Sequence, residues 1–410
     1  MAAPATTIGV LRNRTFRLLW TGSTVSALGS WLLVVAAPYQ VFRLTGSTPA
    51  TGLALAVEAA PAMLVGPWAG VLVDRVDRRT TMIVADLFSA AGVALVLLGT
   101  TPSRLGFVYL GLLAENLAVV FFRPAAQAAV PAVVSGGELV AANALTGFAG
   151  GAARLLGPPL GTVLLSAGGL GLVVGIDVAS YLGSAAATAA VTLPRTRRPA
   201  AHPFAARDVV SQLRDGLRHL LTAPVLRGLL ITGWAYLTAN AALGALLVPF
   251  VVGRLARPGQ DIGYLLAGLG VGYLAGSAVS RRLIDRFPIR SVVTATYAAV
   301  GACFVALFNA PTLLLATVAA AASGVPGAVA LVATQHRIQA DTPDHVRGRV
   351  GAVFYASDAS ATVAGALLAP ALTAVMGLHL GLTVLTGAVV ATAVAALVLV
   401  SPNRSQDVGS

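Results

Sequence analysis

The chain has 410 residues, of which 57% are hydrophobic and only 10% are charged, whereas an ordinary soluble domain carries about 25% charged residues. A water-soluble fold cannot bury this much apolar surface, so the composition indicates a protein that lies in lipid. The basic residues are all arginine, with no lysine in the chain, which excludes a phosphate-loop lysine and therefore ATP hydrolysis as the energy source.

The formal net charge of +12 would suggest nucleic acid as the partner of a soluble protein. Here the arginines lie in short segments between apolar runs, which is typical of membrane orientation signals, so we expect no nucleic-acid partner. The chain has a single cysteine, Cys303, and five scattered histidines. Neither set has the spacing of metal ligands, so we expect no metal site. We also expect no cofactor and no enzyme activity.

Apolar runs long enough to cross a bilayer follow one another along the chain. Six are predicted at residues 18–42, 50–73, 80–100, 105–128, 139–166 and 170–193. After a polar, arginine-rich stretch, six more are predicted at 224–252, 262–281, 290–309, 311–335, 348–376 and 378–400. We therefore expect an all-α membrane protein of twelve transmembrane helices in two six-helix halves, 1–193 and 224–410, joined by a basic linker, 194–223.

Arginine is concentrated at the N-terminus, in the linker and in alternate loops. This bias predicts that both termini and the linker are cytoplasmic, because basic residues mark the inner side of a membrane protein. The two halves also resemble each other: Ala69 to Arg75 after the second run has a counterpart in Ala275 to Arg281 after the eighth. Such a repeat is typical of transporters with a binding site near the middle of the bilayer.

Charged side chains inside the apolar runs are the most informative feature, because each costs roughly 2.5–3.5 kcal/mol near the centre of a spanning helix. The charged residues singled out in these runs are Glu58, Glu115, Arg123, Arg154, Asp177 and Asp358. We expect them to line a substrate or proton pathway, or to pair with one another.

In the fourth run, Asn116, Arg123 and Gln127 are spaced to lie on one stripe of a helix, with Glu115 at its edge. The stripe predicts a helix that lines a wet cavity, in which Glu115 exchanges a proton. The alternative is a structural polar seam, with Arg123 extending to the cytoplasmic interface.

Arg154 shares a helix face with Gly147 and Gly150, which predicts that it points into close-packed protein, where it pairs with a buried carboxylate or binds an anionic substrate group. Asp358 lies near the middle of its run and is either a proton carrier or the partner of a buried donor. Glu58 and Asp177 lie in the outer third of their runs, where a pathway role and a role at the membrane interface remain equally open.

Short motifs carry a resemblance to the major facilitator superfamily. The segment from Gly70 to Arg79 resembles its signature between helices 2 and 3, with Asp77 at a position where glycine is usual. Gly157, Pro158 and Gly161 resemble the antiporter signature of helix 5. The segments 122–131 and 139–145 are similar to the drug and siderophore efflux branch. The signature residues are Gly70, Asp74, Arg75, Asp77, Arg78 and Arg79.

The resemblance implies the twelve-helix fold of that superfamily, with helices 1, 4, 7 and 10 around a central cavity. It also implies a cell-membrane protein that works as a monomer and exports amphipathic, drug-like or siderophore-like molecules by proton antiport and alternating access. A proton-coupled importer and a lipid flippase of the same fold are the alternatives. We further hypothesise that Asp74 latches the two halves by binding the start of the eleventh helix, where Arg347 and Arg349 lie beside exposed N–H groups.

Overall fold

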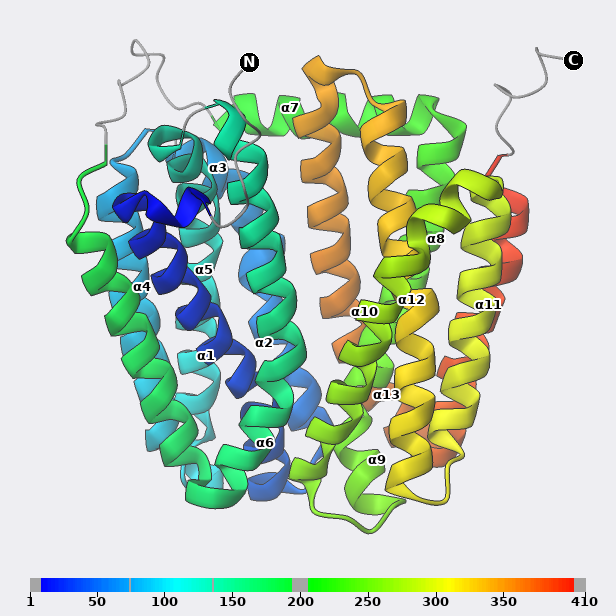
Figure 1. Cartoon of the computed structure of the whole chain (residues 1–410). Coiled ribbons are helices and arrows are strands. Elements are labelled where there is room, and N and C mark those ends of the chain that lie inside the picture. Colours follow the sequence, from blue (N-terminus) through cyan, green and yellow to red (C-terminus); the bar gives the residue numbers. More distant parts are fainter. Residues whose placement is uncertain (1–8, 74, 135, 194–205, 402–410) are drawn as a thin grey trace, which may run out of the picture. The chain divides into compact units, whose positions relative to one another are not determined.

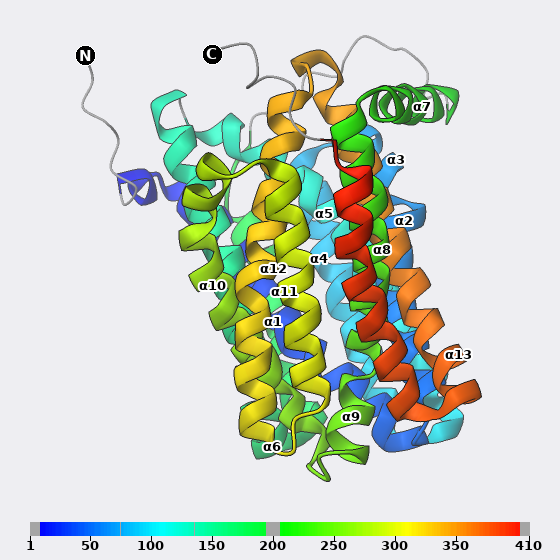
Figure 2. The ribbon, with the colours of Figure 1, turned by 90° about the vertical axis from the view of Figure 1, so that its right-hand side faces the viewer.

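The computed structural model describes residues 9–73, 75–134, 136–193 and 206–401. Throughout these ranges the regular secondary structure is helical, and nine of the helices are long and apolar enough to cross a membrane. The long helices of each unit run side by side as bundles (Figures 1 and 2). The expectation of an all-α membrane protein is confirmed.

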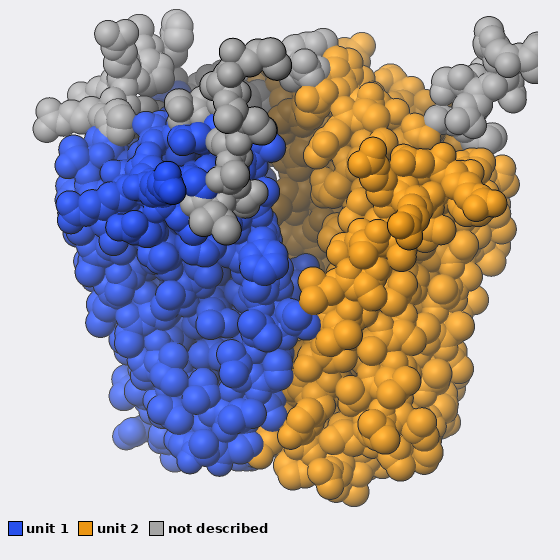
Figure 3. Space-filling model, in the orientation of Figure 1, with its two compact units in different colours: residues 1–45, 60–204 blue, residues 46–59, 205–410 orange. Residues whose placement is uncertain are grey.

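The helices group into two compact units, residues 1–45 with 60–204 and residues 46–59 with 205–410 (Figure 3). The first unit contains η1 (Gly9–Arg12), α1 (Arg14–Thr45), α3 (Gly66–Val73), α4 (Arg78–Leu95), η2 (Val96–Leu98), η3 (Pro102–Arg104), α5 (Leu105–Val133) and α6 (Gly136–Ala189). The second contains α7 (Ala206–Thr222), α8 (Pro224–Ala245), α9 (Leu247–Gly253), η4 (Gly259–Asp261), α10 (Ile262–Arg286), α11 (Ile289–Phe308), α12 (Leu313–Asp341) and α13 (Asp344–Leu399).

Helix α2 (Thr48–Leu64) contributes residues to both units. Hydropathy places residues 46–59 in the first bundle, 1–193, whereas their contacts place them in the second unit. The reason is close packing: a Cβ at Gly52 would overlap the Ala366 carbonyl oxygen and lie 2.7 Å from Cγ of Pro370, both on α13.

The two longest elements each change direction at a glycine. The backbone of α6 leaves helical geometry at Gly169 (φ 66°, ψ −168°), and that of α13 does so at Gly377 (φ 77°, ψ 168°). A positive φ is accessible to glycine at little cost. Each element therefore consists of two helices, and both glycines fall in the gaps between the predicted runs.

Glycines also set how closely neighbouring helices approach. A Cβ at Gly268 would lie 2.7 Å from the Thr317 carbonyl oxygen, and one at Gly276 would lie 2.8 Å from the Ala328 Cβ. Helices α10 and α12 therefore pack backbone to backbone, which is the use of small residues expected inside a membrane.

Part of the predicted linker is a helix. Residues 206–222 form α7, which runs crosswise to the long helices of its own unit and packs against α8 and α13 (Figures 1 and 2). Gly216 makes this contact possible, because a Cβ there would lie 2.7 Å from the Arg349 carbonyl oxygen. Leu220 is fully buried on the same side of α7.

Candidate functional site

Among its described residues, the first unit contains three buried carboxyl groups. Glu115 on α5, Asp177 on α6 and Asp86 on α4 are 5%, 0% and 1% exposed. No arginine in the described part of the chain forms an ion pair with any of them. Burying an ionised carboxylate without a partner is expensive, so these side chains are unusual for a purely structural core.

Glu115 is tied to two other helices through hydroxyl groups. The Tyr181 hydroxyl on α6 donates a hydrogen bond of 2.9 Å to Glu115 Oε1. The same hydroxyl lies 2.8 Å from Ser30 Oγ on α1, and Ser30 Oγ is 3.2 Å from the Ser26 carbonyl oxygen. A continuous hydrogen-bonded chain therefore joins α5, α6 and α1.

Asp177 lies one helical turn before Tyr181 and thus on the same face of α6. Its Oδ1 accepts a hydrogen bond of 3.3 Å from Ser180, while its Oδ2 has no partner among the described residues. Helix α1 approaches closely here, because a Cβ at Gly29 would overlap both Asp177 Oδ1 and Ser180 Oγ. Glu115 and Asp177, hereafter the carboxylate pair, thus adjoin the same tyrosine.

Asp177 has no exposed surface. This burial argues against a side chain that extends to the membrane interface, and the pathway role of Asp177 stays a prediction. Asp86 is a residue that sequence analysis missed, although a carboxyl group in an apolar run is the signal that singled out the others. Its Oδ2 also lacks a partner within the described residues.

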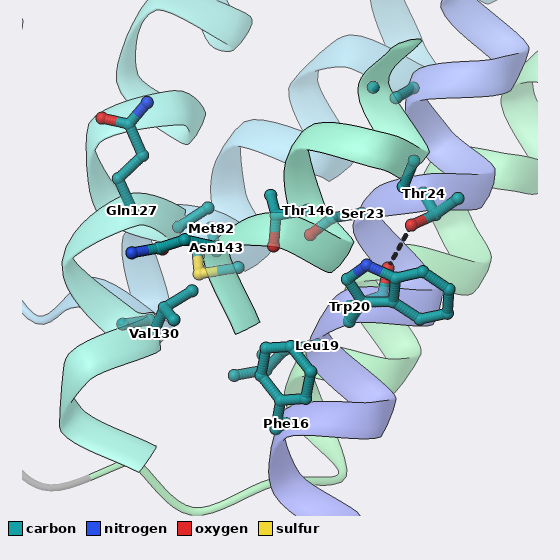
Figure 4. A pocket seen from close by; sticks show the side chains of 15 residues that line it. Phe16, Leu19, Trp20, Ser23, Thr24, Met82, Gln127, Val130, Asn143 and Thr146 are labelled. Carbon is teal, nitrogen blue, oxygen red and sulfur yellow. Dashed lines mark hydrogen bonds between the residues drawn. The ribbon is translucent and has the colours of Figure 1, made fainter. Parts of the chain in front are cut away.

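A cavity of about 230 Å³ lies in the same unit, between α1, α4, α5 and α6. Figure 4 shows Gln127 of α5 and Asn143 of α6 at its wall, with Phe16 and Trp20 of α1 on another side. The indole N–H of Trp20 has no partner among the described residues. The cavity thus combines an apolar surface with a few hydrogen-bonding groups. Its further lining residues are Leu19, Ser23, Thr24, Ala27, Met82, Ala126, Ala129, Val130, Thr146, Ala149 and Gly150.

The predicted polar stripe of α5, Asn116, Arg123 and Gln127, does not line a single cavity. Gln127 lines the cavity, and Arg123, one turn earlier, is exposed. Asn116 is half-buried, and its amide donates a hydrogen bond of 3.0 Å to the Leu112 carbonyl of its own helix. Asn116 is therefore absent from the wall of this cavity.

The structure corrects the prediction that Arg154 points into close-packed protein. The side chain is exposed, and its guanidinium stacks over the Trp31 ring at 5.1 Å from the centroid. A cation over an indole face is a favourable arrangement that needs no carboxylate partner. Gly157, Pro158 and Gly161 continue the same helix, and Gly161 lies against the backbone of Leu32, so this part of α6 packs directly on α1.

The remaining charged candidates lie elsewhere. Glu58 is half-buried on α2. Asp358 on α13 is exposed, and its backbone carbonyl accepts a hydrogen bond of 2.9 Å from the Thr362 hydroxyl. Asp358 therefore does not belong to a buried cluster like that of the first unit.

The turn between α3 and α4 is held by specific hydrogen bonds. Asp77 caps α4 by accepting 2.9 Å and 2.8 Å bonds from the backbone N–H and hydroxyl of Thr80. Arg78 donates to the Ala128 carbonyl of α5 at 2.9 Å, and Arg79 donates to the Thr188 carbonyl at the end of α6 at 3.3 Å. Both arginines therefore do more than anchor the chain at the membrane surface, while Gly70 has open space around it.

Asp74 lies outside the described residues, so its predicted latch remains a hypothesis, and Arg75 is exposed in the turn. In the second unit, Arg347 donates a 3.3 Å bond to the Thr342 carbonyl. Arg349 forms an ion pair of 3.1 Å with Asp215 of α7. The carboxylate partner of Arg349 among the described residues is therefore in the linker helix.

Apolar helices of spanning length, an interior with unpaired carboxyl groups and a cavity of mixed polarity define a multi-pass membrane transporter. The model of the transmembrane secretion effector family, a branch of the major facilitator superfamily, matches residues 5–409. The chain belongs to that family, whose members are transporters and not enzymes, and it is a multi-pass protein of the inner membrane.

Relatives and solved structures agree with this membership. The enterobactin exporter EntS of Escherichia coli O1:K1 / APEC is 28% identical over 88% of this chain and 86% of the exporter. The corresponding exporter of Shigella boydii serotype 4 is 27% identical over the same shares. The nucleoside transporter NupG has a TM-score of 0.78 at 14% identity, covering 95% of this chain and 100% of NupG. A bacterial homologue of the iron transporter ferroportin has a TM-score of 0.74 at 15% identity, covering 95% and 99%.

Proposed function

We propose that the protein exports a small amphipathic molecule, drug-like or siderophore-like, in exchange for protons by alternating access. The observation that carries the proposal is the carboxylate pair, which is buried with no cationic partner among the described residues, in a chain similar to an exporter over 88% of its length. The exchange has an energy source, because a proton entering the cell gains roughly 2.3 kcal/mol per 100 mV of membrane potential.

The carboxylate pair is the proposed proton site. One proton removes one buried negative charge, and an uncompensated buried charge costs several kcal/mol. Binding and release of that proton would therefore change the stability of one transport state relative to another. Asp358 is the second proposed carrier, because it is a carboxylate within a membrane-spanning helix, where ionisable side chains mark proton and substrate pathways.

The cavity between α1 and α6 is the proposed binding site for one part of the substrate. Its volume of about 230 Å³ is below the roughly 300–1,000 Å³ of pockets that enclose a drug-sized molecule. We infer that it accepts one apolar portion, which Gln127 and Asn143 orient through hydrogen bonds. The exposed guanidiniums of Arg123 and Arg154 would attract negatively charged groups.

The proposed topology has twelve spans and cytoplasmic termini. Dividing α6 and α13 at Gly169 and Gly377, and counting α2 with α3 as one span, gives this number. In a Cys303→Ser background, single cysteines at Ala206 and Pro258 can be labelled in intact cells with an impermeant maleimide. Labelling at position 258 alone supports the topology, and labelling at 206 alone would invert it.

Transport itself is tested in two steps. Accumulation of dyes, macrolides and siderophores is first compared in efflux-deficient cells with and without the protein, which identifies a substrate. The purified protein is then reconstituted, and substrate and proton fluxes are measured under an imposed pH gradient.

Charge-neutralising variants locate the proton site. Glu115→Gln and Asp177→Asn should fold, exchange substrate without a gradient and lose gradient-driven transport, while Asp358→Asn tests the second carrier. Asp285→Asn is the matched control, because Asp285 is 67% exposed and pairs with Arg281 at the end of α10. If all three variants respond to an uncoupler as the wild type does, the coupling assignment is wrong.

The reconstituted protein also distinguishes the antiporter from the two alternatives, a proton-coupled importer and a lipid flippase. A proton-coupled importer would move protons and substrate in the same direction, whereas an antiporter moves them in opposite directions. A flippase would instead transfer a fluorescent phospholipid between leaflets.

A further inference from the structure

Helix α7 presents an exposed apolar stripe that its own unit does not cover. Val210, Leu217 and Leu221 are 53%, 42% and 51% exposed. Their spacing of seven and four residues places them on one side of the helix, at 100° per residue. An adjacent side, about 80° to 120° from Val210 around the helix, is occupied, because Gly216 lies against the α13 backbone and Leu220 is fully buried.

Two arginines border this stripe. Arg214 and Arg218 follow Val210 by about 40° and 80° around the helix, and both are exposed. Among the described residues neither guanidinium has a hydrogen bond or an ion pair, whereas Arg349 is already paired with Asp215. An apolar stripe with free arginines at one edge has the arrangement of a helix that lies at a membrane surface.

The position of α7 fits that arrangement. It runs crosswise to the spanning helices of its own unit and ends just before α8 begins at Pro224 (Figures 1 and 2). The first exposed large hydrophobic residue of α8 is Ile231, about two turns further along. The Asp215–Arg349 ion pair and the Gly216 contact hold α7 at this level.

We propose that α7 is an interfacial helix that binds acidic phospholipid. Leu217 and Leu221 enter the boundary of the acyl chains, and Arg214 and Arg218 bind the phosphates above them. The charge of the partner follows from the two unpaired guanidiniums, because a basic residue near an acidic membrane surface is attracted to it. Since α7 contacts Arg349 in the second turn of α13, bound lipid would be linked to a membrane-spanning helix.

Lipid retention by the full-length protein tests whether Arg214 and Arg218 select an acidic phospholipid. Purified protein in detergent is mixed with phosphatidylglycerol or with phosphatidylcholine of the same acyl chains, and bound lipid is counted by native mass spectrometry. Arg214→Gln with Arg218→Gln should weaken phosphatidylglycerol retention by about fivefold per arginine, the factor that corresponds to about 1 kcal/mol per basic residue. Arg281→Gln with Arg282→Gln is the control of equal charge at another helix end.

If the α7 variant and the control lose the same amount of phosphatidylglycerol, the attraction is unspecific and the proposal is overturned. It is also overturned if wild-type protein retains both lipids equally.

Depth in the bilayer tests the apolar stripe independently. In the Cys303→Ser background, a fluorophore on Leu217→Cys is placed in liposomes that contain brominated phosphatidylglycerol or brominated phosphatidylcholine. Quenching that is stronger with the brominated phosphatidylglycerol supports the proposal. A fluorophore that neither lipid quenches lies in water, and one that both quench equally has no selective lipid; either result overturns it.

Discussion

Gly29 marks the closest approach of α1 to the carboxylate pair, and we predict that Gly29→Ala destabilises the first unit. An added Cβ would overlap Asp177 Oδ1 and lie 3.1 Å from the Ser180 Cβ. Overpacking of this kind costs about 1–3 kcal/mol in the free energy of unfolding. Alanine in place of a helical glycine gains about 0.8–1 kcal/mol. The net change is therefore between zero and a loss of about 2 kcal/mol.

Gly183→Ala is the matched control, because no atom lies within 4 Å of a Cβ added at Gly183 of α6. It keeps the gain in helix propensity without the overlap, so the two variants should differ by about 1–3 kcal/mol. Both are unfolded with increasing SDS from the same detergent, and circular dichroism gives the free energy of unfolding. Equal stability of the two variants would refute the packing argument. Gradient-driven transport should slow only in Gly29→Ala, because only that variant displaces Asp177.

Three further predictions concern hydrogen bonds and charges. Tyr181→Phe removes the buried donor to Glu115 and should lower the free energy of unfolding by about 1–3 kcal/mol; an unchanged thermal unfolding profile would contradict it. Arg79→Gln should cost about 1 kcal/mol and speed hydrogen exchange in the last turn of α6, with unchanged exchange as the contrary result. A double-mutant cycle of Asp215→Asn and Arg349→Gln should give a coupling energy of about 0.2–1 kcal/mol, and additivity of the two changes would show that the ion pair contributes nothing.

The membrane class and the helix breaks follow from composition and pattern. The apolar content leaves no soluble alternative, and Gly169 and Gly377 lie where one apolar run ends and the next begins. Glycine is the residue for which a positive φ at such a bend costs least, so the bends are encoded locally. The Asp77 cap is equally local, since its partner Thr80 is three residues away.

Contacts between distant helices could not be predicted in the same way. Counting residues along a run gives the depth of Asp177 but not the approach of α1 at Gly29, which buries it. Arg154 stacks on Trp31 because α6 crosses α1 at that level, a fact that helix periodicity does not contain. Hydropathy describes each helix alone, whereas the site depends on which helices pack together.

The hydroxyl chain at Tyr181 has two possible directions for its hydrogen bonds. When Glu115 is ionised it only accepts, so Tyr181 donates to it and Ser30 donates to Tyr181, as the distances of 2.9 Å and 2.8 Å allow. When Glu115 carries a proton it can donate to Tyr181, which then donates to Ser30, and Ser30 turns to the Ser26 carbonyl 3.2 Å away. A proton gained on α5 would thus reverse the polarity of a chain that ends on α1, with hydrogens moving and the heavy atoms keeping their places.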